Sequence, residues 1–329
     1  MTLPLHDFRV VAPRDVAEAV TVHAAEPGSR YLAGGTDLLV NLRRGLGAPP
    51  QLVDLSGIAE LGALEMTEKG TRIGAGVTLA RLAANAAVRA RHRAVAEAAA
   101  AVAGPAHRNL ATVAGNLCLD TRCIYYNQSD WWRGANGYCL KYRGDVCHVA
   151  PQGQHCHAAF SGDLAPALLV AGAVVEVAGR DGRRRLPLAE LYREDGRAHL
   201  TLEPGELVVA LELPAAVPPS AYEKLRVRGS IDFPLAGVAV ALAARDARIQ
   251  ALQVALTGTN SRPFLLAGTA ALAGRALDQA LLRELDKLVQ KQVQPMRTTL
   301  AQSNYRRIAA AALARRLVAR LWSGQEAAA

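Results

Sequence analysis

Aromatic residues and long apolar runs are scarce in this chain. Only 5% of its 329 residues are Phe, Trp or Tyr, and the longest apolar run, 164–175, contains Pro166. That run is too short for a bilayer, because a membrane helix needs about 20 apolar residues. The first residues include an early acid, Asp7, and lack the apolar core of a secretory signal. These absences predict a cytoplasmic protein without a membrane span.

The sequence also lacks the basic and aromatic interleaving by which many proteins bind single-stranded nucleic acid. Its formal net charge is +9, which taken alone would raise nucleic acid as a partner. The densest basic run, 183–185, belongs to what we interpret as a solvated hairpin turn that starts at Gly179. We therefore expect no nucleic-acid partner.

The remaining composition is that of an ordinary globular protein, with 51% hydrophobic and 20% charged residues. The order of strand, glycine turn, helix and strand between 29 and 55 predicts a small α/β unit. A second unit follows from 56, and a proline-rich linker at 214–220 separates it from further strands and two helices. We expect an α+β protein with subdomains at 1–55 and 56–215 and a C-terminal domain at 216–329.

Local signals place the helices and strands of these units. Asp15 and Thr78 are expected to cap helices. Other helices are expected at 38–44, 90–102, 276–292 and 303–322, and strands at 29–33, 51–55, 72–75, 173–178, 184–188, 206–213, 221–227, 235–243 and 249–257.

A first glycine motif lies between the strand at 29–33 and the helix at 38–44. Glycine lets backbone N–H groups approach a ligand closely, and consecutive N–H groups bind anions such as phosphate. A helix that begins there would add a favourable dipole. A plain turn capped by Thr or Asp explains the motif equally well. The candidate binding residues are Leu32, Ala33, Gly34, Gly35, Thr36, Asp37 and Leu38.

Two further motifs follow along the chain. The segment 111–117 contains Thr112, Ala114, Gly115 and Asn116, and it is interpreted as a second turn that offers backbone donors. The segment 161–168 supplies one carboxylate, Asp163, immediately before a buried apolar stretch.

In this order, the three motifs resemble the flavin subunits of the xanthine dehydrogenase and carbon monoxide dehydrogenase family of molybdenum hydroxylases. The resemblance covers nearly the whole chain and includes 224–228, 232–234, Gly258 and 305–307. It implies a two-subdomain FAD-binding domain of the PCMH type, similar to vanillyl-alcohol oxidase. A C-terminal α+β domain with an antiparallel sheet and helices would follow.

The resemblance also implies how FAD would bind. The first two loops would hold the pyrophosphate, Asp163 would lie near the ribityl and ribose groups, and Val102 and Lys224 would complete the site. The family often has Gly where this chain has Ala114, and Ser where it has Gly162. Pyrophosphate binding should survive the first change if φ at Ala114 is negative.

All five cysteines lie in 118–160, and four of them, Cys123, Cys139, Cys147 and Cys156, are separated by 15, 7 and 8 residues. No Cys-x-x-Cys pair is present, so the spacing matches no common zinc motif. Four thiolates suit a [4Fe–4S] cluster as well as zinc. Buried free thiols are the third possibility, since free cysteine is often buried.

The segment 118–160 itself resembles an extra loop in the flavin subunits of 4-hydroxybenzoyl-CoA reductases, a group within the same family. In most of the family the motifs at Asn116 and Asp163 are joined by a short connection, whereas here they are 47 positions apart. The resemblance implies that the four spaced cysteines bind one [4Fe–4S] cluster and that Cys118 does not. Trp131 and Trp132 are expected to pack over the cluster, and the neighbouring histidines to hydrogen-bond or face solvent.

By this resemblance the chain is an electron-transfer subunit without catalytic residues of its own. Its partners would be a molybdenum-binding large subunit and a [2Fe–2S] small subunit, in a dimer of heterotrimers. Reduced ferredoxin would supply electrons for the reductive dehydroxylation of 4-hydroxybenzoyl-CoA to benzoyl-CoA. The alternatives are another hydroxylase of the family, a flavoprotein with a structural zinc loop, and a scaffold that binds no cofactor.

Overall fold

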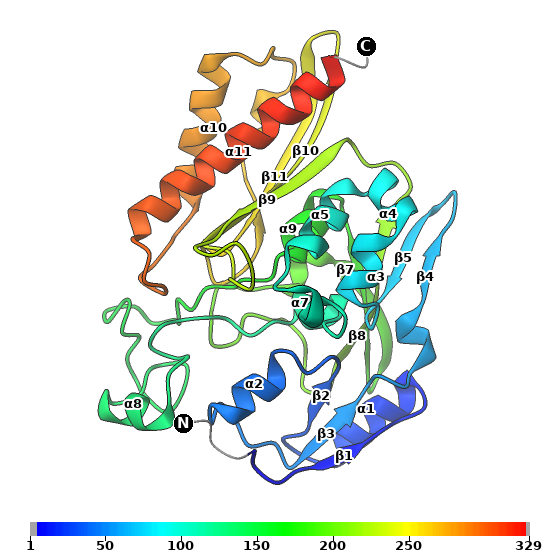
Figure 1. Ribbon diagram of the computed structural model, residues 1–329, viewed down its shortest axis with the longest axis vertical. Coiled ribbons are helices and arrows are strands. Elements are labelled where there is room, and N and C mark those ends of the chain that lie inside the picture. Colours follow the sequence, from blue (N-terminus) through cyan, green and yellow to red (C-terminus); the bar gives the residue numbers. More distant parts are fainter. Residues whose placement is uncertain (1–4, 327–329) are drawn as a thin grey trace.

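The fold is built on three sheets, each formed by one continuous part of the chain (Figure 1). A computed structural model describes residues 5–326. The expectation that no signal sequence is present rests in part on residues 1–4, which lie outside the described residues, as do residues 327–329. Among residues 5–326, every helix is too short or too polar to cross a membrane.

The first sheet is parallel, with strand order β1-β3-β2. Its strands are β1 (Arg9–Val11), β2 (Arg30–Leu32) and β3 (Gln51–Asp54), and its crossover helices are α1 (Val16–Ala25) and α2 (Leu38–Arg43). Parallel neighbours need such crossovers, since a tight turn can only join antiparallel strands. The predicted cap of α1 is confirmed, because Asp15 Oδ1 accepts a hydrogen bond from the Glu18 N–H at 2.8 Å.

The second sheet is antiparallel, with strand order β4-β5-β8-β6-β7. Its strands are β4 (Leu64–Met66), β5 (Gly70–Gly74), β6 (Val174–Gly179), β7 (Gly182–Pro187) and β8 (Leu207–Pro214). Between β5 and β6 run α3 (Leu79–Ala84), α4 (Ala86–Arg91), α5 (Arg93–Ala101), α6 (Pro105–Arg108), α7 (Val113–Leu117), α8 (Asp130–Ala135) and α9 (Leu164–Val170). Thr78 caps α3 as predicted, whereas the helix expected at 90–102 starts only at Arg93, because α4 ends before His92.

The third sheet is antiparallel and has helices on both faces (Figure 1). It consists of β9 (Ser220–Leu225), β10 (Ala236–Arg245), β11 (Arg248–Thr257) and β12 (Phe264–Leu265), followed by α10 (Gln279–Gln292) and α11 (Ser303–Glu326). On β10, Val238, Val240 and Leu242 are buried in the core with α10 and α11. The alternate residues Ala239 and Ala241 belong to the core of the preceding part of the chain. One strand therefore joins both cores, because successive side chains of a strand point to opposite faces.

These three sheets confirm the expected fold class, an α+β protein whose C-terminal domain has an antiparallel sheet and helices. The basic run 183–185 is exposed, as expected, but it follows the hairpin turn and does not form it. These arginines lie on β7, where Arg183 pairs with Glu60 and Glu176, Arg184 with Glu206, and Arg185 with Glu212. Much of this local positive charge is therefore balanced within the chain.

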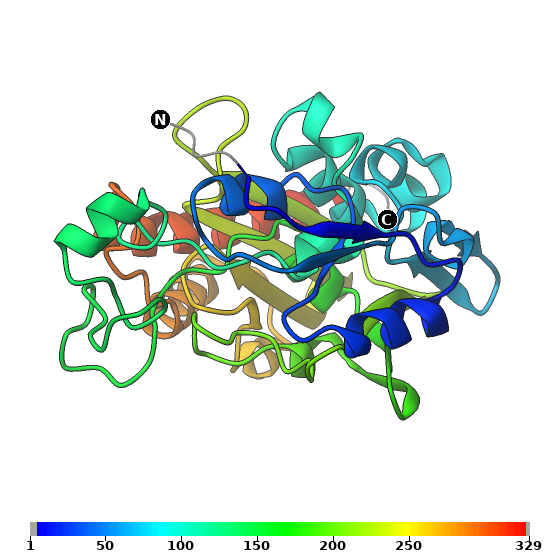
Figure 2. The same cartoon turned by 90° about the horizontal axis from the view of Figure 1, so that it is seen from below.

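Between α7 and α9 the chain leaves the sheets and forms the cysteine segment, residues 118–160. Its one regular element is the short helix α8, whose N-cap Ser129 accepts a hydrogen bond from the Trp132 N–H. Figures 1 and 2 show this segment at one edge of the molecule. The backbones of Arg122 and Ala159 close its base through two reciprocal hydrogen bonds of 2.8 Å.

Candidate functional site

The first glycine motif forms an open loop between β2 and α2, here called the flavin loop, Gly34–Asp37. A Cβ on Gly34 would lie 1.9 Å from the Leu110 carbonyl oxygen, so only glycine permits this close approach. Gly35 has a φ of +67°, which favours glycine as well. Among residues 5–326, no protein group accepts a hydrogen bond from any of the four loop amides. The loop can therefore donate several N–H groups to an anion.

The second motif, expected to be a turn with free donors, is instead the short helix α7, and its donors are already used. The Val113 and Ala114 amides donate to the Val77 and Ala75 carbonyls, both at 3.0 Å. Thr112 caps the helix, because its Oγ1 accepts from the Gly115 N–H at 3.2 Å. Ala114 has a negative φ, and this is the backbone conformation in which alanine can replace the glycine of the family without strain. Flavin binding by this segment stays a prediction.

Asn116 connects this helix to the third motif. Its Oδ1 accepts a hydrogen bond of 3.0 Å from the Leu164 N–H, at the start of α9. A Cβ on Gly162 would lie 2.5 Å from the Asn116 carbonyl oxygen. A serine at position 162, which the family often has, would therefore require the backbone here to shift.

Asp163 lies in a buried ion pair with Lys224. Its Oδ2 is 3.0 Å from the Lys224 Nζ, and the two side chains are 4% and 3% exposed. Its Oδ1 accepts a hydrogen bond of 2.6 Å from the Tyr222 hydroxyl. Desolvation raises the pKa of Asp163, and the positive charge of Lys224 opposes that rise. The pair links α9 to β9, and the predicted contact of these residues with FAD remains a prediction.

Tyr222 was not among the residues predicted from the sequence. It lies two positions before Lys224 on β9, so both side chains are on one face of the strand. That spacing could have identified it. Val102, which was predicted, is the C-cap of α5, and its carbonyl accepts a hydrogen bond of 2.7 Å from Arg108 Nη1.

The four spaced cysteines come together around one small cavity. Cys123, Cys139, Cys147 and Cys156 are all buried and line it. The other lining residues are mostly aromatic or apolar, and Lys141 adds a positive charge: Tyr125, Tyr126, Leu140, Lys141, His148, Val149 and Ala158. Four cysteines spread over more than 30 residues therefore lie around the same cavity. Their spacing in the sequence did not by itself predict this.

Backbone donors point at the sulfur atoms of this cavity. The amides of Val149, Ala150 and His157 interact with Cys147, and the Ala158 N–H lies 3.4 Å from the Cys156 Sγ. A hydrogen bond from the Cys156 thiol lowers the pKa of Cys147. Such donors stabilise thiolates and are one means by which proteins tune iron–sulfur centres.

Within residues 5–326, no three His, Cys, Asp or Glu side chains are arranged to hold a metal ion. The ligands of a [4Fe–4S] cluster are arranged differently, because each thiolate binds a separate iron atom and the four surround a core. The donor set fits that arrangement, with four thiols around one cavity, N–H groups directed at sulfur, and the Lys141 ammonium beside them.

Lys141 is a functional candidate that the sequence did not suggest. Its side chain is 5% exposed, and its Nζ donates to Asp120 Oδ1 at 2.7 Å. The ammonium also lies 4.3 Å from the centre of the Tyr126 ring. Its only sequence signal was its position two residues after Cys139.

The tryptophans of the segment differ from each other. Trp131 is 79% exposed, so the expectation that it packs over the cysteines was wrong. The ring of Trp132 lies beside that of Tyr125, with 6.2 Å between the ring centres. Tyr125 in turn lines the cavity. His148 hydrogen-bonds the Tyr138 carbonyl, as expected for a histidine that is not a ligand. Cys118 is absent from the cavity lining, and desolvation raises the pKa of its thiol to about 12.

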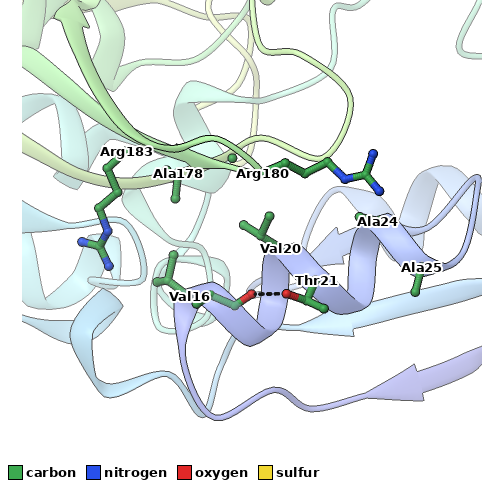
Figure 3. Close-up of a pocket in the computed structure, with 11 residues that line it drawn as sticks. Val16, Val20, Thr21, Ala24, Ala25, Ala178, Arg180 and Arg183 are labelled. Atoms are coloured by element: carbon green, nitrogen blue, oxygen red, sulfur yellow. Dashed lines mark hydrogen bonds between the residues drawn. The ribbon is translucent and has the colours of Figure 1, made fainter.

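A separate groove of 630 Å³ lies between α1 and the β6–β7 hairpin (Figure 3). Small and apolar side chains such as Val16, Val20 and Ala24 line it, and Arg180 and Arg183 flank it. None of the predicted flavin or cysteine residues contributes to its lining.

Two families of known proteins match most of this chain. Residues 6–216 match the FAD binding domain in molybdopterin dehydrogenase, and residues 220–321 match the CO dehydrogenase flavoprotein C-terminal domain. The chain belongs to the FAD-binding subunits of the xanthine dehydrogenase and CO dehydrogenase family. As a member of this molybdenum hydroxylase family, it is an FAD-binding oxidoreductase subunit.

Individual relatives of this flavin subunit include the aldehyde oxidoreductase FAD-binding subunit PaoB of Escherichia coli K12. The two are 35% identical over 262 residues, which is 75% of this chain and 80% of the relative. The carbon monoxide dehydrogenase medium chain of Afipia carboxidovorans is 28% identical over 94% of each chain. A crystal structure of the Cu,Mo-CO dehydrogenase superposes with a TM-score of 0.80 at 25% identity, covering 98% of this chain and 99% of that one.

Proposed function

We propose that this flavin subunit also carries a [4Fe–4S] cluster and transfers electrons between that cluster, FAD and the other subunits of a molybdenum-containing complex. The observation that supports the cluster is the meeting of Cys123, Cys139, Cys147 and Cys156 around one buried cavity. Relatives are named medium chains, which supports partners of larger and smaller size. In our proposal these are a molybdenum-binding large subunit and a [2Fe–2S] small subunit. The assembly would be a cytoplasmic dimer of heterotrimers.

Different residues would hold the two cofactors. The free amides of the flavin loop are the donors for the FAD pyrophosphate, with Leu32, Ala33 and Leu38 beside them. Asp163 would lie at the flavin too, although it already accepts from Tyr222 and Lys224. Thr112 and α7 would support the flavin loop from beside it, because their hydrogen bonds are already made within the protein. When bound, the cluster supplies a one-electron carrier and FAD a carrier of one or two electrons. Lys141 would balance thiolate charge at the cysteines.

For the reaction of the complex, our first candidate is the reductive dehydroxylation of 4-hydroxybenzoyl-CoA with electrons from reduced ferredoxin. The resemblance of the cysteine segment to the extra loop of those reductases supports it. The net charge of +9 would attract an acidic electron donor, an effect that salt should weaken.

The second candidate is aldehyde oxidation, in which electrons would leave through this subunit. The 35% identity to an aldehyde oxidoreductase FAD-binding subunit favours it. The same residues of this chain would serve either direction of electron flow, so only the assembled complex can separate the two reactions.

The cluster is tested by metal and sulfide analysis of the anaerobically purified chain, followed by EPR of the reduced protein. We expect four iron and four sulfide per chain, the content of one [4Fe–4S] cluster. Cys139→Ser should abolish or strongly change the reduced-state signal, while Cys118→Ser, the matched control, should leave it unchanged. Equal loss in both variants would show that the ligands are misassigned, and zinc in place of iron would support the structural zinc loop instead.

The reaction is tested on the assembled complex with two substrates. Formation of benzoyl-CoA from 4-hydroxybenzoyl-CoA and a low-potential one-electron donor would support the first candidate. Aldehyde oxidation without benzoyl-CoA formation would support the second. A complex that acts only on purines or carbon monoxide would refute both and leave the cofactor assignments intact.

A further inference from the structure

The helix α2 touches both cofactor sites, although it is only six residues long. The flavin loop leads directly into its first residue, Leu38. Residues Gly45 and Leu46, just beyond its end, reach the cysteine segment. In Figure 1 the helix lies between β2 and the segment that carries α8.

At the start of α2, Arg122 joins the two sites. Its guanidinium pairs with Asp37, the last residue of the flavin loop, and its Nη1 donates to Asn41 Oδ1 at 3.1 Å. Asn41 Nδ2 in turn donates to Asp37 Oδ2 at 3.0 Å. Asp37 makes no side-chain cap bond to its own helix, so its carboxylate is committed to this triangle. Arg122 directly precedes Cys123 in the sequence.

At the other end of α2, Arg133 makes the corresponding contact. Its side chain is 1% exposed, and its Nη2 donates to the Gly45 carbonyl at 3.1 Å. The guanidinium lies 4.6 Å from the centre of the Tyr142 ring. Leu46 then packs in the same buried group as Cys123, Cys139 and Cys156.

Two arginines, the buried Arg133 and the partly buried Arg122, therefore hold one helix from the cysteine segment. An arginine removed from water must keep its partners, because an unpaired buried charge is costly. The segment that supplies them is nearly all loop, with only α8 as regular structure. Ligation of one core by four thiolates would cross-link these loops and fix the places of Arg122 and Arg133.

We propose that α2 couples the two cofactor sites, so that a cluster on the four cysteines tightens FAD binding and bound FAD tightens cluster binding. Arg122 and Arg133 are the positioning residues of this coupling. The inference rests on the proposed cluster. The coupling is reciprocal, because each cofactor must change the binding of the other by the same factor.

The test measures the FAD dissociation constant of the full chain, by flavin fluorescence, with the cluster present and after its removal by a chelator. The cluster-loaded wild-type chain should bind FAD about tenfold more tightly, a usual size for coupling between two sites. Arg122→Gln should bring this ratio to near one while iron content and EPR signal are kept. Arg44→Gln is the matched control, because it removes a charge from the end of the same helix and Arg44 is exposed.

A wild-type ratio of one, or an unchanged ratio in Arg122→Gln, would overturn the coupling. If Arg122→Gln loses its cluster, Asn41→Ala replaces it, because that variant opens the triangle and leaves the cysteine segment intact. Retention of the full ratio in Asn41→Ala would likewise overturn the coupling. A wild-type chain without iron would instead refute the proposed function, so the two failures are distinguishable.

Discussion

The flavin loop and the helix α7 lie close together, since Gly34 sits against the backbone at Leu110 and Ala111, just before Thr112. Their amide groups nevertheless differ. Those of the flavin loop have no acceptor among residues 5–326, whereas those from Val113 to Asn116 all donate to protein oxygens. A free run of donors can bind a phosphate group, while a satisfied run contributes to the stability of the fold.

This difference predicts that the two glycine motifs respond to mutation in opposite ways. Changes in the flavin loop should lower FAD affinity beyond any cost to the fold, because its free amides would bind the ligand directly. Changes in α7 should lower the free energy of unfolding and leave FAD affinity nearly unchanged, because this helix supports α9 through Asn116.

The largest effect is expected for Gly34→Ala. Its new Cβ would lie 1.9 Å from the Leu110 carbonyl oxygen, and backbone on both sides would have to move. We expect FAD affinity to fall by more than about tenfold, which corresponds to roughly 1.4 kcal/mol. FAD content and dissociation constant measure it, with Gly57→Ala as control, since a Cβ there meets nothing within 4 Å. Full FAD content in Gly34→Ala would remove the distinction between the two motifs.

A smaller loss of FAD affinity is expected for Gly35→Val. Its control is Gly172→Val, because the two glycines have the same backbone conformation. Gly35 and Gly172 have φ values of +67° and +70°, and a Cβ on Gly172 meets nothing within 4 Å. Valine in this left-handed region should cost either site about 1–2 kcal/mol in the free energy of unfolding. FAD affinity should fall about fivefold to tenfold only in Gly35→Val, because only that loop would bind the ligand. Equal FAD affinity in both variants would contradict the flavin loop assignment.

Most of the fold could be predicted because its signals are local. The cap at Asp15, the strand alternation on β10 and the proline-rich stretch after β8 each act through neighbouring residues. Short elements such as β1 and β4 were missed, since three residues carry too little periodicity to be distinguished from a loop. The division of the chain at 55 and 215 remains a proposal.

The candidate site was predictable only in part, because its geometry depends on contacts between distant residues. Glycines mark where a backbone can approach a ligand, but whether its amides are free depends on partners such as Val77 and Ala75. The pairing of Asp37 with Arg122 spans 85 positions, and no sequence pattern connects them. Trp131 shows the opposite error, since a large apolar side chain in a cysteine segment was assumed to be buried.

The smallest effect, and the one that completes the comparison, is expected for Thr112→Val. Valine keeps the shape of threonine but removes the Oγ1 that accepts from the Gly115 N–H. The loss of this cap should lower the free energy of unfolding by about 1 kcal/mol. FAD affinity should change by less than about threefold, because the backbone of α7 keeps its other hydrogen bonds. Chemical denaturation and flavin titration measure the two quantities, and Thr112→Ser, which keeps the hydroxyl, should restore stability. A loss of FAD affinity as large as that in Gly35→Val would show that the Thr112 hydroxyl contacts the flavin, and that α7 belongs to the binding site and does more than support it.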